Sequence, residues 1–146
     1  MASDNPEPKK GKKSRGSANR SGSSTSETTE KIYYLVFENS PVQSLVNTRA
    51  TLDFEASSTI SVGRDPNTNT IVIPDPDVSR HHAEFSMNGT RVILKDLGSS
   101  NGTYLHDGKE FQELHDSAPV KLKSMIKFGT STIVKLTRET ETQYEH

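Results

Sequence analysis

Four short polar groups in this chain could carry chemistry. They are Gly63-Arg64, the run 78–82 (Val-Ser-Arg-His-His), the run 98–103 (Gly-Ser-Ser-Asn-Gly-Thr) and the acidic turn 75–77. The first three supply guanidinium groups, hydroxyls, a carboxamide and glycine-rich backbone, all hydrogen-bond donors suited to the oxygens of a phosphate. No carboxylate pair and no nucleophile–base pair is evident among those three. They predict a protein that binds without turnover and is not an enzyme.

Short predicted strands flank these groups and place them in loops. Apolar runs rich in β-forming residues alternate with turn residues at the spacing of an all-β sandwich, and none shows sustained helical periodicity. The runs cover residues 32–37, 51–54, 59–62, 70–73, 83–87, 91–95, 103–105, 120–122, 125–128 and 132–136. Residues 83–87 alternate apolar and polar side chains, which gives one buried face and one wet face. Asn88-Gly89, which follows, predicts a hairpin turn that needs a positive φ.

Composition divides the chain into a folded part and two tails. Residues 1–30 have almost no apolar side chains and cannot bury enough surface to offset the entropy of ordering, so we expect a disordered tail rich in Ser, Gly and Lys. Residues 138–146 are predicted to form a flexible C-terminal tail, which leaves 31–137 as the domain. The first 30 residues carry six basic and four acidic side chains, a balance of +2, so a net charge of −1 leaves −3 for the rest. If the domain binds an anion, it must therefore do so with a few placed donors and not with a broad positive field.

Several classes of protein are excluded or made less favourable by composition. The chain has no cysteine, so it has neither a disulfide framework nor a thiolate metal site. It lacks an apolar run of ~18 residues and the apolar stretch of a signal peptide, so a cytoplasmic protein, or a nuclear one in a eukaryote, is the default expectation. The pair His81-His82 has no third metal ligand within reach in the sequence, and adjacent strand residues point to opposite faces. We therefore expect no metal and no cofactor.

The order of the donor groups resembles the signature of the forkhead-associated (FHA) domain. The resemblance rests on Gly63-Arg64, then Ser79-x-x-His82, then Asn101-Gly102-Thr103, each between predicted strands, and it covers about residues 32–136. It implies an eleven-stranded β-sandwich that holds its ligand in loops at one end. It also implies an adaptor that recognises phosphothreonine on partner proteins in Ser/Thr kinase signalling, because FHA domains read phosphorylated motifs.

The resemblance implies a role for each matching residue. Five positions would bind the phosphothreonine: Arg64, Ser79, Arg80, Ser100 and Asn101. Arg64 would place its guanidinium on the phosphate, and Asn101 would bond the peptide backbone beside it. Three further positions, Gly63, His82 and Gly102, match the structural positions of the family, with His82 pinning one loop to another. The family also prefers threonine to serine, which a small apolar pocket for the γ-methyl group would explain.

The loop before Ser79 predicts a preference in the ligand. In the resembled family, this loop helps to choose the residue three places after the phosphothreonine. Here it offers Asp75 and Asp77, whose charges would repel an acidic residue. We expect basic or apolar residues to be favoured there.

The segment 26–30 (Ser-Glu-Thr-Thr-Glu) is similar to an N-terminal Glu-Thr-Thr segment of some small bacterial FHA proteins. In those proteins a Ser/Thr kinase phosphorylates the segment, and the FHA domain of the same protein then binds it. Thr28 and Thr29 are therefore candidate phosphosites. Four residues extend at most ~14 Å, whereas a strand is ~17–20 Å long, and the family's first strand starts far from the ligand loops. Capture by a second molecule, giving self-association, is thus more feasible than capture by the chain's own pocket.

Other interpretations remain open on sequence alone. Taken singly, Arg64 could be a surface charge, Ser79 a turn hydroxyl, and Asn101-Gly102 a simple turn. An FHA-like scaffold could bind partners without phosphate, and matched phosphorylated and unphosphorylated peptides would separate the two cases. The basic stretch 9–20 could touch nucleic acid, although cations diluted by Gly and Ser usually form a solubilising tail. A monomer without a membrane partner is the default.

Overall fold

The computed structural model describes the backbone of residues 27–144 and the side chains of residues 32–139. Ile32–Glu139 form one compact unit, compared with the predicted domain of 31–137. No helix in the part of the chain described is long and apolar enough to span a membrane.

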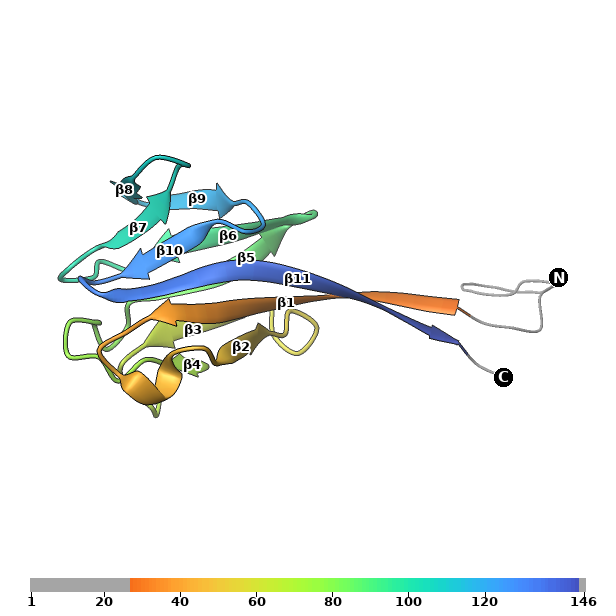
Figure 1. The fold of residues 1–146 in the computed structure, drawn as a ribbon, viewed down its shortest axis with the longest axis horizontal. Coiled ribbons are helices and arrows are strands. Elements are labelled where there is room, and N and C mark those ends of the chain that lie inside the picture. Colours follow the sequence, from red (N-terminus) through yellow and green to blue (C-terminus); the bar gives the residue numbers. More distant parts are fainter. Residues whose placement is uncertain (1–26, 145–146) are drawn as a thin grey trace, which may run out of the picture. The chain divides into compact units, whose positions relative to one another are not determined.

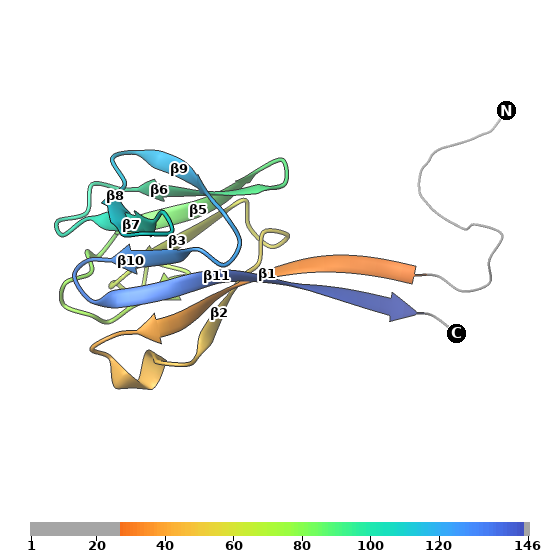
Figure 2. The same ribbon diagram turned by 45° about the horizontal axis from the view of Figure 1, so that its top comes forward.

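Two β-sheets make up the compact unit (Figures 1 and 2). One sheet has the strand order β2-β1-β11-β10-β7-β8, and the other has the order β4-β3-β5-β6-β9. The strands are β1 (Glu27–Asn39), β2 (Arg49–Leu52), β3 (Thr59–Gly63), β4 (Ile71–Val72), β5 (Ala83–Asn88), β6 (Arg91–Asp96), β7 (Thr103–His106), β8 (Phe111–Glu113), β9 (Ser117–Val120), β10 (Met125–Phe128) and β11 (Thr132–Tyr144). A 3-10 turn, η2 (Gln43–Leu45), joins β1 to β2. The predicted eleven-stranded all-β sandwich is confirmed.

The core lies between the sheets and follows from the alternation of side chains along each strand. In β5, Ala83 and Phe85 are fully buried while Glu84 lies half-exposed on the outer face. Phe85 packs edge-to-face against Phe128 of β10, with ring centroids 6.4 Å apart. Burial of each such large side chain stabilises the fold by roughly 1.5–3 kcal/mol, so this contact holds the two sheets together beside the ligand end.

The β5–β6 hairpin has the turn that its sequence predicts. Asn88 pairs with Arg91, so Gly89 and Thr90 form a two-residue connection. Gly89 adopts φ +64°, a value that glycine reaches without steric cost. The expected positive φ is confirmed.

Several predicted element boundaries were wrong. Strand β1 begins at Glu27, not at residue 32, and β11 continues to Tyr144, beyond residue 136, where the last predicted strand ends. The disordered N-terminal tail and the flexible C-terminal tail stay predictions. The β-branched threonines in both stretches favour extended backbone. The disorder predicted for residues 1–26 lies outside the described residues. Strand β8 was missed because three residues are too few to show an alternating pattern, and β9 ends at Val120, where a strand was expected to begin.

Candidate functional site

Arg64 follows directly on β3, and the neighbouring loop directs its side chain. Its backbone N–H donates to the carbonyl of Ser79 at 3.0 Å, and its Nε donates to the carbonyl of Val78 at 2.9 Å. The side chain is exposed, and its two Nη atoms make no hydrogen bond or ion pair within the described part of the chain. A guanidinium held at Nε with both Nη groups unoccupied can bind an anion through two parallel hydrogen bonds.

Gly63 allows two loops to approach closely behind Arg64. Gly63 is buried, and a Cβ atom there would lie 2.2 Å from the carbonyl oxygen of Arg80, so no larger residue fits. Asn69 fills the adjacent space, and its Nδ2 donates to the carbonyls of Asp65 at 2.8 Å and Arg80 at 2.6 Å. The amide thus joins the loop after Arg64 to the run that carries Ser79. Sequence reasoning missed Asn69, because its role depends on carbonyls that only the fold brings near it.

Ser79 and Ser100 meet across two different loops. The Oγ atom of Ser79 accepts the backbone N–H of Ser100 at 2.9 Å. The hydroxyl hydrogen of Ser79 therefore remains available to a further acceptor. Ser100 is exposed, and its own hydroxyl has no partner among the described residues. Two free hydroxyl donors thus lie beside the loop that anchors Arg64.

Asn101 is held in place at the edge of the same cluster. Its side-chain Nδ2 donates to the backbone carbonyl of Asp77 at 2.9 Å. The Tyr104 hydroxyl donates to the backbone carbonyl of Asn101 at 3.2 Å. Gly102 follows with φ +89°, a left-handed conformation in which glycine is favoured. The carboxamide is exposed and oriented, as a side chain that contacts a peptide backbone must be.

His82 ties the two ligand loops together from below. The imidazole is fully buried; the N–H of Ser79 donates to its Nδ1 at 3.0 Å, and its Nε2 lies 2.9 Å from the carbonyl of Gly102. Because Nδ1 accepts, the proton must sit on Nε2, which donates to Gly102. Burial lowers the pKa of His82, although the Gly102 carbonyl and nearby acids act in the opposite direction. The ring is therefore a neutral bridge, as its expected pinning role requires.

Asp96 organises the loop that carries Ser100 and Asn101, a role that sequence reasoning missed. Its carboxylate accepts the N–H groups of Gly98 and Ser99, at 2.9 and 3.1 Å. It also accepts the hydroxyls of Ser99 and Thr103, both at 2.6 Å. Partial burial raises the pKa of Asp96, but these hydrogen bonds outweigh it and hold the pKa below its usual value. The Asp-Leu-Gly-Ser spacing, typical of an Asx turn, was the available signal.

The structure corrects the interpretation of the acidic turn. Asp75 is 1% exposed, and its carboxylate accepts the Thr132 hydroxyl at 2.7 Å and the N–H of Asp77 at 2.9 Å. It therefore faces the interior and does not present its carboxylate at this surface. Asp77 is exposed, with one carboxylate oxygen bonded to the Thr130 hydroxyl at 2.6 Å. Of the two aspartates, only Asp77 presents charge at this surface.

One predicted position, Arg80, takes no side-chain part in the hydrogen-bonded cluster, and two others lie outside the described side chains. The guanidinium of Arg80 is exposed and joins none of the hydrogen bonds around Ser79 in the described residues; it lies near Asp65, whose lowered pKa it supports. The side chains of Thr28 and Thr29 lie outside those described. Across the described range, no group of His, Asp and Glu side chains is arranged to hold a metal ion.

Comparison with known proteins shows which proteins this chain resembles. Residues 60–129 match the family model of the FHA domain. The chain is 38% identical over 79 residues to the glycogen accumulation regulator GarA of Mycolicibacterium smegmatis, a match that covers 54% of this chain and 46% of GarA. The chain thus spans less than half the length of that curated relative.

Solved structures show the same fold. The FHA domain of an Arabidopsis thaliana hypothetical protein superposes with a TM-score of 0.61 at 29% identity, over 84% of this chain and 93% of that one. The FHA domain of MEK1, solved in complex with a phosphothreonine peptide of HOP1, superposes with a TM-score of 0.53 at 18% identity, over 72% of this chain and 94% of that one.

Proposed function

This chain contains an FHA domain, and from that premise we propose that it is a non-catalytic adaptor that captures phosphothreonine on partner proteins. One observation carries the proposal. The loops of Arg64, Ser79 and Ser100 are joined by hydrogen bonds, and each of these side chains keeps donors that no described residue uses. The MEK1 domain, which shares the fold, binds a phosphothreonine peptide.

The chemistry of the cluster matches a phosphate better than a carboxylate. A phosphate monoester carries about −1.5 to −2 charge and three strong acceptor oxygens. The Nη pair of Arg64 suits two of these oxygens, and the hydroxyls of Ser79 and Ser100 suit the third and the remaining lone pairs. Asn101 would then bond the peptide backbone. A carboxylate has only two oxygens and a single charge, so it would leave donors unpaired.

A preference for threonine over serine belongs to the proposal. A γ-methyl group seated in an apolar pocket adds roughly 0.8 kcal/mol by transfer, and up to about 3 kcal/mol in a tight pocket. The partner's phosphothreonine is the product of a Ser/Thr kinase, which would place the adaptor downstream of such a kinase.

Asp77 would select against acidic residues three places after the phosphothreonine. It is the exposed aspartate of its loop, and its backbone carbonyl holds the Asn101 side chain that would contact the peptide. An oriented phosphopeptide library should therefore disfavour Asp and Glu at that place. Asp77→Asn should remove the bias, and enrichment of acidic residues by the unaltered chain would contradict it.

The decisive experiment measures binding to one peptide sequence in three forms: with phosphothreonine, with phosphoserine and with unmodified threonine. We expect the order phosphothreonine, then phosphoserine, with no measurable binding of the unmodified form. Equal binding of the modified and unmodified peptides would favour the phosphate-independent scaffold. Failure of every peptide in a degenerate phosphothreonine library would reject the proposal.

A further inference from the structure

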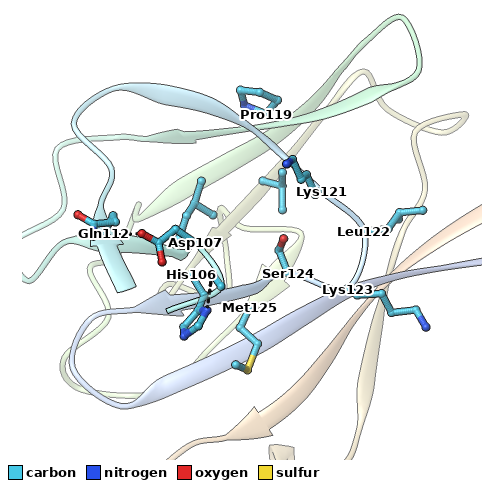
Figure 3. Close-up of a pocket in the computed structure, with 12 residues that line it drawn as sticks. His106, Asp107, Gln112, Pro119, Lys121, Leu122, Lys123, Ser124 and Met125 are labelled. Atoms are coloured by element: carbon cyan, nitrogen blue, oxygen red, sulfur yellow. Dashed lines mark hydrogen bonds between the residues drawn. The ribbon is translucent and has the colours of Figure 1, made fainter. Parts of the chain in front are cut away.

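A second hollow surface lies away from the proposed phosphate site. A cavity of about 550 Å³ opens between the β7–β8 turn and the β9–β10 loop (Figure 3). Strands β8 and β9 are the edge strands of their respective sheets, so the cavity occupies an open edge of the sandwich. Leu105, Val120 and Met125 give it apolar walls, while Lys121 and Lys123 stand on the loop at its mouth.

A smaller cavity adjoins the first and shares four lining residues with it. It has a volume of about 390 Å³, and both cavities are lined by residues 119–122. Tyr33 and Val92 contribute apolar surface to it, and Arg91 and Arg138 contribute charge. Residues 119–122, the end of β9 and the start of the loop after it, therefore border both hollows; we call them the ridge.

The conformation of the ridge keeps an apolar side chain at the surface. The N–H of Ser124 donates to the carbonyl of Lys121 at 3.2 Å, which closes a turn. Lys123 adopts φ +73° in this turn, a left-handed value that is strained for a residue with a Cβ atom. Leu122 is 37% exposed at the tip, one of two large apolar side chains exposed to that degree in the described residues. Figure 3 shows Leu122 pointing away from the first cavity.

The charge on this surface is predominantly positive. The cations Arg91, Lys121, Lys123 and Arg138 form no ion pair with any described residue. The acid in the lining is Asp107, whose carboxylate is occupied by the N–H groups of Lys109 and Glu110, each at 2.9 Å, and by the Gln112 amide at 3.3 Å. This local positive charge contrasts with the net −3 carried by the chain beyond residue 30.

We propose that this ridge binds a second class of ligand: an extended, unphosphorylated segment of a partner protein in which acidic residues flank bulky apolar ones. Apolar side chains enter the two hollows that the ridge borders, and carboxylates meet the four cations. An extended peptide can cross the ridge and fill both hollows, whereas a fatty acid fills one, and a nucleic acid lacks aliphatic anchors.

The surface is independent of the phosphate loops. Strand β10 (Met125–Phe128) runs from the ridge loop to the ligand end, and its four residues span about 13 Å. A partner could therefore occupy both sites through two segments of one chain, and the linkage would raise the overall affinity without a new contact.

The test uses the full chain, labelled with ¹⁵N, and a peptide of about ten residues that alternates glutamate with leucine. We expect amide shifts within residues 119–125 and 90–92, weakened by raising NaCl to about 0.5 M because salt screens exposed charges. The double variant Lys121→Glu, Lys123→Glu should bind about tenfold or more weakly. Leu122→Ser should also weaken binding.

Controls separate this site from the phosphate site. Lys95→Glu reverses an exposed cation on β6 outside both linings and should leave the affinity within about twofold. Arg64→Ala should also leave it unchanged, whether or not phosphothreonine binding holds. The inference is overturned if charge reversal of Lys121 and Lys123 has no effect, or if a glutamine–leucine peptide binds equally well. It is also overturned if oleate or a short oligonucleotide, and not the acidic peptide, perturbs the ridge.

Discussion

Replacing Arg64 by lysine and by alanine separates the charge of this side chain from its planar fork. Lysine keeps the positive charge but lacks Nε, so it cannot donate to the carbonyl of Val78 and also offer a second parallel bond to the ligand. Alanine removes both contributions. In each variant the backbone N–H at this position still reaches the carbonyl of Ser79.

The expected losses follow from the number of hydrogen bonds removed. A hydrogen bond to a charged group contributes about 1.5–3 kcal/mol, so Arg64→Ala should cost about 3–6 kcal/mol of binding free energy. That corresponds to an affinity loss of roughly 100-fold to more than 10⁴-fold. Arg64→Lys loses about one such bond, or roughly 10- to 100-fold. The contact with Val78 also involves the charged guanidinium and contributes up to about 1.5–3 kcal/mol to folding, less than the typical stability of a domain, so both variants should stay folded.

Fluorescence anisotropy with one peptide, phosphorylated and unphosphorylated, measures these losses, and thermal unfolding checks the fold. Arg91→Ala is the matched control, since it removes an exposed arginine at the start of β6, at the opposite end of the β5–β6 hairpin from His82. It should change phosphopeptide affinity by less than about twofold. A folded lysine variant that binds as tightly as the unaltered chain would refute the two-bond geometry. A folded alanine variant with a loss below tenfold would refute the site itself.

Three further predictions concern the framework of the site. Burial lowers the pKa of His82, so the stability that this group contributes is complete above the unfolded pKa of about 6.5 and is lost as pH falls through the folded pKa. Urea unfolding between about pH 7.5 and 5 should show this loss. In the His82→Asn variant, the free energy of unfolding should depend less on pH over this range. Gly63→Ala places a Cβ atom 2.2 Å from the Arg80 carbonyl and should cost about 1–3 kcal/mol of unfolding free energy by urea titration. Asp96→Ala removes acceptors for two N–H groups and two hydroxyls, so it should cost about 3 kcal/mol or more and also weaken phosphopeptide binding in a titration.

The local sequence pattern was sufficient to predict most strands but not where they begin and end. The alternation in 83–87 predicts β5 because burial on one face imposes a period of two, and Gly89 predicts the hairpin that follows. Strand β8 has three residues, and only its ladder with β7 makes it a strand. The ends of β1 and β11 likewise depend on pairing across the sheet, which short-range composition does not encode.

The residues of the candidate site also divide into those that the sequence revealed and those that only the fold revealed. Arg64, Ser79 and Asn101 could be named as candidates from the sequence because their types and order form a motif. Asn69 was missed because its partners, the carbonyls of Asp65 and Arg80, are ordinary backbone atoms in the sequence. The expectation that Asp75 faces the ligand was wrong, because its carboxylate turns inward to accept the hydroxyl of Thr132, 57 residues away in the sequence.

The neutral imidazole beneath the ligand loops has a kinetic consequence. His82 already links Ser79 to Gly102 in the free protein, so under the proposed function its loops are held in place before a ligand arrives. Encounter then needs little rearrangement, so different phosphopeptides should associate at similar speeds. Their affinities would differ mainly in how long each stays bound, and residence time becomes the property by which this module ranks its partners.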